Sequence, residues 1–129
     1  MLKSLLAISL GASLGASLRW LLSLWLNGFL MYIPLGTLSA NLIGGYLIGI
    51  FFGVFSTFSE LSPELRLFII TGFLGALTTF SAFSLETSLL LKDARMFWAL
   101  CTIALNVCGS LLMTFLGFGT YNLLKNFYS

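Results

Sequence analysis

The sequence predicts an all-α integral membrane protein with four transmembrane helices and a break in the third. Hydrophobic residues make up 59% of the 129-residue chain and charged residues only 8%, whereas a soluble domain carries about 25% charged residues. A glycine- and threonine-rich stretch inside one apolar segment predicts the break. Because each spanning helix needs about 20 apolar residues, four spans with short loops use nearly the whole chain, and we expect a single membrane domain, 1–129.

Four apolar segments of sufficient length follow one another along the chain. We expect spans at about residues 2–26, 35–58, 66–91 and 96–124. The first runs from Leu2 to Leu26, which is too long for the core of an ordinary signal peptide, so we interpret it as a retained span. Before the third, Ser62 has the character of a helix cap, with Pro63 at the first helical position and Glu64 facing the helix dipole.

The third segment contains the stretch from Gly72 to Glu86, which reads GFLGALTTFSAFSLE. Each glycine weakens a helix by roughly 1 kcal/mol relative to alanine, and the hydroxyls of Thr78 and Thr79 compete for backbone hydrogen bonds. In lipid, a loosened backbone needs partners in neighbouring protein, in water or in a bound ion. Glycine-interrupted membrane segments also point to binding sites in transport proteins. We interpret this stretch as a broken helix that lines a pathway or holds an ion.

Polar residues inside the spans have two interpretations. The Asn41 amide needs partners in hydrocarbon, so it either links helices or faces a polar path. In the fourth segment, a spacing of four places polar side chains on one helix face; these are Thr102, Asn106, Ser110 and Thr114. Such a stripe serves either interhelical hydrogen bonding or a hydrated track.

Arg19 lies near the end of the first segment, directly before Trp20. One interpretation is that its side chain reaches the membrane interface beside an aromatic belt. The other is that it stands at a water-filled vestibule, where its charge raises the local anion concentration. The residues alone leave both open.

The available side chains favour transport or a structural role over enzyme chemistry. The chain has no histidine and no phosphate-binding loop or metal motif, and its net charge of +2 is too small to indicate nucleic acid. Neutral hydrogen-bond donors predominate in the spans, and such groups suit an anion. The electropositive ring edges of Phe80 and Phe83 suit an anion as well. One alternative is a small multidrug or cation exporter, for which only Glu86 offers a membrane acid. A non-transporting accessory subunit is the other.

Basic residues hardly distinguish the two sides of the membrane. The side of the termini holds three and the opposite side two; they are Lys3, Arg66 and Lys125 against Lys92 and Arg95. This difference is a weak orienting signal. A chain with so little bias is able to insert both ways up, and we hypothesise an antiparallel dimer of opposite copies.

Three stretches of the sequence together resemble the signatures of the Fluc fluoride channels, also called CrcB. They are GASLGASLRW at 11–20, GTLSAN at 36–41 and GFLGALTTFSAF at 72–83. The resemblance covers the whole chain in order, length and number of spans. One departure is Trp20, where the family usually has tyrosine, and an interfacial aromatic residue is retained there.

The resemblance implies a passive fluoride-selective channel that lets fluoride leak out of the microbial cytoplasm across the plasma (inner) membrane. It also implies a dual-topology antiparallel homodimer with two pores and a structural sodium ion (Na⁺) at its centre. On matching positions, the phenylalanine pair of the pore falls on Phe80 and Phe83, the pore asparagine on Asn41, the vestibule arginine on Arg19, and the sodium-binding carbonyls on Gly75 and Thr78. The fourth span has no sharp motif, so there we choose Asn106 and Ser110 as pore residues, with Thr114 behind them. Glu86, in the third span, ends this polar track.

Overall fold

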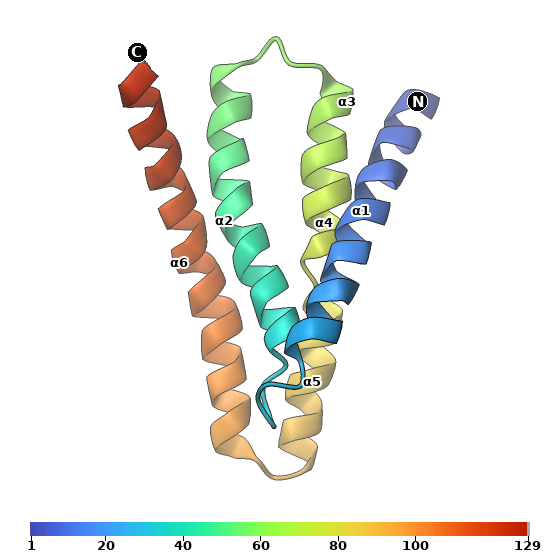
Figure 1. Cartoon of the computed structure of the whole chain (residues 1–129), viewed down its shortest axis with the longest axis vertical. Helices are drawn as coiled ribbons and strands as arrows, with labels where there is room; N and C mark the ends of the chain where they lie inside the picture. The colour runs from blue at the N-terminus through green and yellow to red at the C-terminus, as the bar shows by residue number, and fades with distance from the viewer. Residues whose placement is uncertain (129) are drawn as a thin grey trace.

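The computed structural model describes residues 1–128, which are helical apart from short connections (Figure 1). The elements are α1 (Leu2–Leu26), α2 (Leu35–Thr57), α3 (Pro63–Arg66), η1 (Leu67–Leu74), α4 (Gly75–Leu77), α5 (Phe80–Lys92) and α6 (Met96–Tyr128). Among the described residues, four helices are long and apolar enough to cross a membrane, namely Leu2–Leu26, Leu35–Thr57, Pro63–Lys92 and Met96–Tyr128. The prediction of an all-α chain with four candidate spans is confirmed.

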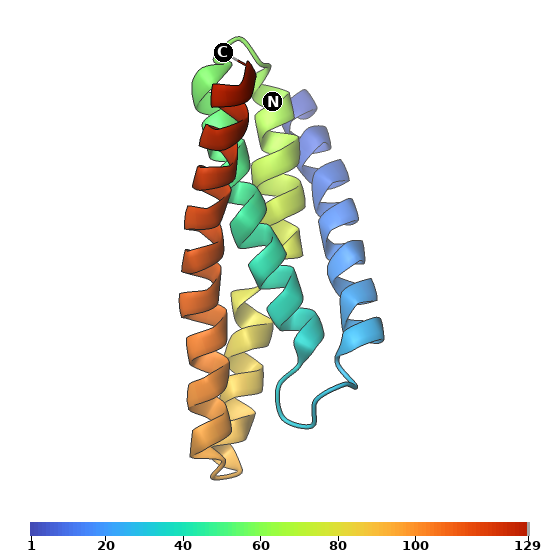
Figure 2. The same ribbon diagram turned by 60° about the vertical axis from the view of Figure 1, so that its left-hand side comes forward.

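The four rods stand side by side, with α2 between α6 and the composite rod of α3, η1, α4 and α5 (Figure 1). Helix α1 packs along η1 and α4. Both termini lie at the same end of the bundle, as an even number of spans requires, and the rods spread apart at that end. Figure 2 shows that the third rod is interrupted between α4 and α5.

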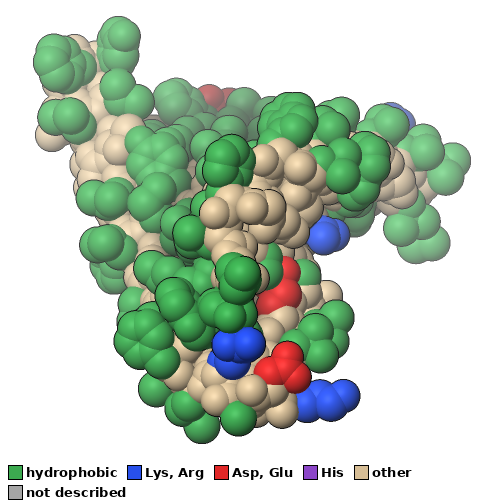
Figure 3. Space-filling model, turned by 60° about the horizontal axis from the view of Figure 1, so that its bottom comes forward, with side chains coloured by type: hydrophobic (Ala, Val, Ile, Leu, Met, Phe, Trp, Pro, Cys, Tyr) green, Lys and Arg blue, Asp and Glu red, His purple; other side chains and the backbone are tan. Residues whose placement is uncertain are grey.

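Apolar side chains cover much of the molecular surface, and charged side chains form only small patches on the face in Figure 3. Leu10, Leu112 and Phe115, for example, are more than half exposed in the single chain. A surface of this kind is stable against lipid rather than water.

The helix ends differ by a few residues from the predicted ones. The third rod begins at Pro63, three residues before the predicted start, because the Ser62 side chain caps it by accepting a hydrogen bond from the Leu65 amide at 3.2 Å. The predicted roles of Ser62 and Pro63 are confirmed. Helix α2 ends at Thr57 and α6 continues to Tyr128.

The break in the third rod is confirmed, and it falls on two threonines. Thr78 (φ −81°, ψ 155°) and Thr79 (φ −151°, ψ 120°) are both extended, and α5 restarts at Phe80. The glycines do not interrupt the helix: Gly72 lies in the wide turns of η1, and Gly75 begins α4. Gly72 is needed for packing, since a Cβ there would lie 2.6 Å from the Ile8 carbonyl oxygen of α1.

Glycines also bring α2 and α6 into backbone contact. A Cβ on Gly49 would overlap the Thr114 carbonyl oxygen, and one on Gly117 would overlap the Tyr46 carbonyl oxygen. Gly45 lies against the Ser110 backbone in the same way. This row of contacts, here called the α2–α6 seam, fixes the distance between two of the rods that surround the candidate site.

The seam gives a prediction about folding. Replacing Gly117 by leucine forces a side chain into backbone, and such overpacking costs about 1–3 kcal/mol or more. Gly119, on the same helix, has no atom within 4 Å of an added Cβ. We therefore expect Gly117→Leu to lose the monodisperse peak in detergent size-exclusion chromatography and Gly119→Leu to keep it. Equal behaviour of the two variants would show that the seam does not hold the helices together.

Candidate ion pathway at the break

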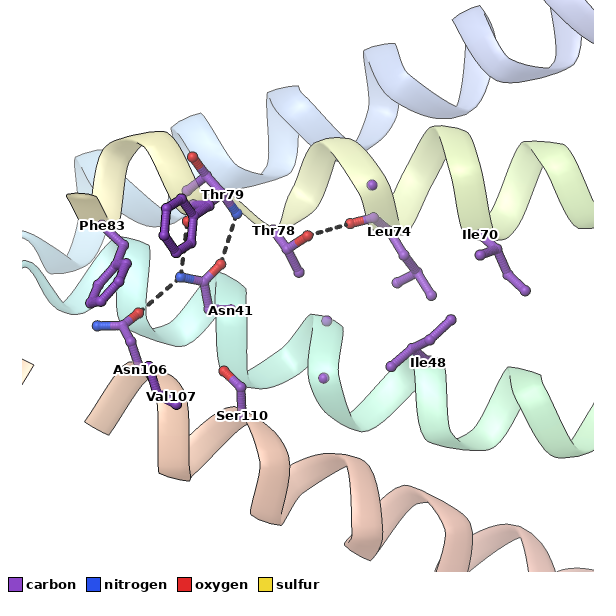
Figure 4. Close-up of a pocket in the computed structure, with 14 residues that line it drawn as sticks. Asn41, Ile48, Ile70, Leu74, Thr78, Thr79, Phe83, Asn106, Val107 and Ser110 are labelled. Carbon is purple, nitrogen blue, oxygen red and sulfur yellow. Dashed lines mark hydrogen bonds between the residues drawn. The ribbon is translucent and has the colours of Figure 1, made fainter. Parts of the chain in front are cut away.

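A cavity of about 440 Å³ lies beside the break, between α2, the third rod and α6 (Figure 4). Seven of the residues predicted from the sequence line it, namely Asn41, Gly75, Thr78, Phe80, Phe83, Asn106 and Ser110. They come from three rods and span 70 positions of the sequence, from Asn41 to Ser110. The lining contains neutral polar groups and apolar groups, and no acidic or basic residue.

Asn41 fastens the broken helix to its neighbours (Figure 4). Its Oδ1 accepts a hydrogen bond from the Thr79 amide at 2.8 Å, and its Nδ2 donates to the Thr79 carbonyl at 3.3 Å. The same Nδ2 donates to Asn106 Oδ1 at 2.8 Å, and Asn106 Nδ2 donates to the Thr102 carbonyl at 3.0 Å. The two interpretations of Asn41 therefore coincide, because one amide both links three rods and lines the cavity.

Two carbonyl groups at the break lose their usual donors. In a continuous helix, the Gly75 carbonyl would accept from the Thr79 amide and the Thr78 carbonyl from the Ala82 amide. Here the Thr79 amide donates to Asn41 and the Ala82 amide to Thr79 Oγ1, at 2.8 and 3.1 Å. Such carbonyl oxygens require another partner inside a membrane, and unwound carbonyls are the ligands that sodium finds in broken helices. The residues present fit a sodium ion.

The two phenylalanines form an edge-to-face pair. Their ring centroids are 5.5 Å apart and the ring planes meet at 63°. Phe83 is buried, at 9% exposure, whereas Phe80 is 77% exposed in the single chain. Both rings line the cavity together with its polar groups, and the edge of a phenyl ring is electropositive.

Three predicted residues do not line the cavity. Thr114 Oγ1 lies on the α2–α6 seam and donates to the Gly45 carbonyl at 2.8 Å. Arg19 approaches the break from α1, where its Nε donates to the Ala76 carbonyl at 3.1 Å. Glu86 lies farther along α5, and its Oε2 accepts from Thr37 Oγ1 at 2.7 Å. The pathway roles of these three residues stay predictions.

Comparison with known proteins decides the family. The family model described as "CrcB-like protein, Camphor Resistance (CrcB)" matches residues 6–118. The chain belongs to the CrcB family. It is 57% identical over 125 residues to the fluoride-specific ion channel FluC of Desulfovibrio desulfuricans, covering 97% of each chain. It is 58% identical to the proteins of the same name from Pseudomonas putida and Tolumonas auensis, covering 94–97% of this chain and 95–98% of theirs.

Sequence reasoning did not assign two polar residues of this CrcB chain to the site, although it noted the hydroxyl of Thr79 at the break. Thr79 caps α5 and supplies the backbone groups that Asn41 holds; a threonine directly before an apolar helical segment is a helix-start signal. Thr37 binds Glu86 and is buried, at 3% exposure. A sequence pattern also pointed to Thr37, because Thr37 and Asn41 are four residues apart and so lie on one helix face.

Proposed function

We propose that this CrcB protein is a passive fluoride-selective channel, which exports fluoride across the plasma (inner) membrane and so reduces fluoride toxicity. We assign it as a channel and not as an enzyme, because its relatives are named fluoride-specific ion channels. The observation that carries the proposal is the cavity lining, where neutral donors and phenyl edges meet with no acidic residue. A cation exporter would need an acid there, and Glu86 lies outside.

Fluoride moves through the cavity by exchanging water for protein donors. The candidates are the amides of Asn41 and Asn106, the Ser110 hydroxyl and the ring edges of Phe80 and Phe83. None carries a full positive charge, so each binds strongly enough to admit the ion and weakly enough to release it. Both Asn41 amide hydrogens are occupied, by Thr79 and Asn106, so fluoride must displace one of these acceptors as it passes.

No energy source is required for export. At acidic external pH, hydrogen fluoride diffuses into the cell and dissociates there, so the fluoride ion accumulates inside above its external concentration. A passive route then carries the ion outward. Arg19 on α1 is assigned to the vestibule, where a cation raises the local anion concentration, while Thr114 and Glu86 continue the polar track beyond the cavity.

We assign the working unit to an antiparallel homodimer of opposite copies. Two features support this: the 77% exposure of Phe80 at the cavity, and the near balance of basic residues across the membrane. A two-fold axis beside the break would bring the Gly75 and Thr78 carbonyls of both copies together. Two carbonyls are few for a hard cation, whereas two copies supply a fuller oxygen shell for sodium.

Sodium removal tests this arrangement. Purified dimer transferred to buffer with N-methyl-D-glucamine in place of sodium is expected to dissociate or to lose thermal stability. The reason is that a sodium ion that binds only the folded dimer stabilises the folded dimer. Adding sodium back should restore dimer mass in light scattering and fluoride efflux together. Unchanged mass and efflux in sodium-free buffer would remove sodium from the account and leave the channel itself standing.

Efflux from proteoliposomes separates the three candidate functions. A fluoride electrode records release from vesicles that contain the purified protein, with potassium permeability supplied by valinomycin. Rapid fluoride release, without chloride release and without a proton gradient, supports the channel. Uptake of a lipophilic cation that depends on a proton gradient would instead identify an exporter, and no flux of either kind would identify an accessory subunit.

A further inference from the structure

A second cavity, of about 330 Å³, lies farther along the same two helices, toward the end of α2 and the C-terminal part of α6. Its lining residues are Gly49, Phe52, Gly53, Ser56, Thr57, Phe118, Tyr121 and Asn122. None of these residues was assigned a part in the pathway above. Along α2 its lining begins at Gly49, directly after Ile48, which lines the cavity at the break.

Both cavities open on the same side of the seam. On α2 the seam residues Gly45 and Gly49 are followed on the same face by Gly53, which packs against the Tyr121 ring of α6. The residue just before each of these glycines lines a cavity, Gly44 and Ile48 at the break and Phe52 in the second cavity. On α6 the cavity residues follow the seam residues by one, as Phe118 follows Gly117 and Asn122 follows Tyr121. Because α2 and α6 run in the same direction (Figure 1), these two flanks face the same side of the helix pair.

The other side of the seam is closed. There the hydroxyl of Tyr46, one residue after Gly45, donates to Thr120 Oγ1 at 2.8 Å. This bond joins α2 to α6 directly. The two cavities therefore lie on one side of the helix pair and this hydrogen bond on the other.

The second cavity repeats the chemistry of the first. Phe52 and Phe118 form a tilted pair with ring centroids 5.8 Å apart and planes at 59°, close to the 5.5 Å and 63° of the pair at the break. The hydroxyl of Tyr121 bonds to that of Thr57, so two O–H groups share one internal bond and a proton is left to donate. The Asn122 amide adds further donors.

The polar stripe of α6 leads to this cavity. Asn106, Ser110 and Thr114 recur every four residues; the next such position holds Phe118, and Tyr121, seven residues after Thr114, is the next polar residue on the same helix face. Thr114 to Tyr121 is seven residues, or about 10 Å along a helix axis. Thr114 lies on the seam between the cavities, where its hydroxyl bonds to the Gly45 carbonyl.

We propose that the second cavity is a hydrated mouth of the anion path, in which fluoride is bound by the Tyr121 and Thr57 hydroxyls, the Asn122 amide and the edges of Phe52 and Phe118. This inference rests on the proposed function. Water and the ion fill the cavity, not a lipid acyl chain. Because both cavities open on the same side of the seam, the ion passes from one to the other along that side.

Thiol labelling from water distinguishes a hydrated mouth from a lipid-filled groove. In a background with Cys101→Ala and Cys108→Ala, Asn122→Cys in proteoliposomes is exposed to the anionic reagent 2-sulfonatoethyl methanethiosulfonate. The matched control is Leu123→Cys, which is next in sequence, at nearly the same depth and 60% exposed. We expect modification of Asn122→Cys with loss of most fluoride efflux, while Leu123→Cys keeps its efflux.

A pair of hydroxyl deletions gives a second, independent readout. Tyr121→Phe removes the hydroxyl that donates to Thr57 and so holds the Thr57 donor in the second cavity, and Tyr46→Phe removes the matching hydroxyl from the closed side. We expect fluoride efflux to fall about tenfold in Tyr121→Phe, in keeping with one lost hydrogen bond to an ion, and to stay at the wild-type rate in Tyr46→Phe. Both proteins should elute as the wild type does in size-exclusion chromatography.

The outcomes separate this inference from the proposed function. If Asn122→Cys is not labelled, or if labelling it leaves efflux unchanged, the mouth is not there, while efflux from the unlabelled vesicles still supports the channel. Equal efflux from Tyr121→Phe and Tyr46→Phe would overturn the inference in the same way. If the cysteine-free parent and the wild type both release no fluoride, the channel and its mouth fall together.

Discussion

Vesicles that contain Phe80→Ile or Phe83→Ile are expected to release fluoride at about a tenth of the wild-type rate or less, because isoleucine keeps the apolar bulk and removes the electropositive ring edge. Phe80 is 77% exposed in the single chain, so its replacement should leave the fold of the chain intact. Phe83 is buried, and a hydrophobic exchange of this kind there costs about 1 kcal/mol. The fluoride electrode measures the loss, and size-exclusion chromatography shows whether assembly is retained.

Phe97→Ile is the matched control. Phe97 is 67% exposed and also forms an edge-to-face pair, with Trp98, but it lies at the start of α6, outside the cavity lining. Its replacement should leave efflux unchanged. Normal efflux from both Phe80→Ile and Phe83→Ile would show that the ring edges do not contact the ion in transit.

Asn41→Asp is expected to reduce both folding stability and fluoride efflux. The change is nearly isosteric, yet it places an oxygen where Nδ2 now lies 3.3 Å from the Thr79 carbonyl and 2.8 Å from Asn106 Oδ1. Lost bonds to buried partners cost about 1–3 kcal/mol each, and a carboxylate would also repel fluoride. We expect efflux at the background rate of protein-free vesicles and a lower midpoint of thermal unfolding.

The Asn27→Asp variant isolates the effect of the amide donors. Asn27 uses only its Oδ1, which accepts from the Gly36 amide at 2.7 Å, so a carboxylate keeps that bond. Its stability and efflux should match those of the wild type. If Asn41→Asp retained wild-type efflux, the Asn41 amide hydrogens would have no part in moving the ion.

Local sequence patterns predicted the spans and the existence of the break, because both depend on residues close together in the chain. The β-branched Thr78 and Thr79 offer capping hydroxyls where the helix is weak, and Thr79 caps the restart at Phe80. Gly72 and Gly75 were predicted to weaken this helix, and both stay helical, Gly72 in the wide turns of η1 and Gly75 at the start of α4. Gly72 serves instead to let α1 approach, and helix propensity cannot distinguish those two uses.

The geometry of the site depends on contacts that no local pattern encodes. Asn41 reaches Thr79 across 38 positions and Asn106 across 65. Only the packing of three rods turns their polar groups toward one cavity. The spacing on α6 likewise placed Thr114 with Ser110, but the close approach of Gly45 turns the Thr114 hydroxyl to a backbone carbonyl instead.

Reversible blockage of the cavity at the break tests most directly whether fluoride passes through it. Ser110→Cys, in the background without Cys101 and Cys108, places a thiol in the cavity lining. Attachment of an anionic methanethiosulfonate should stop fluoride efflux from proteoliposomes, and dithiothreitol should restore it. If mass spectrometry shows complete labelling while efflux continues at its former rate, fluoride takes another route and the account is wrong.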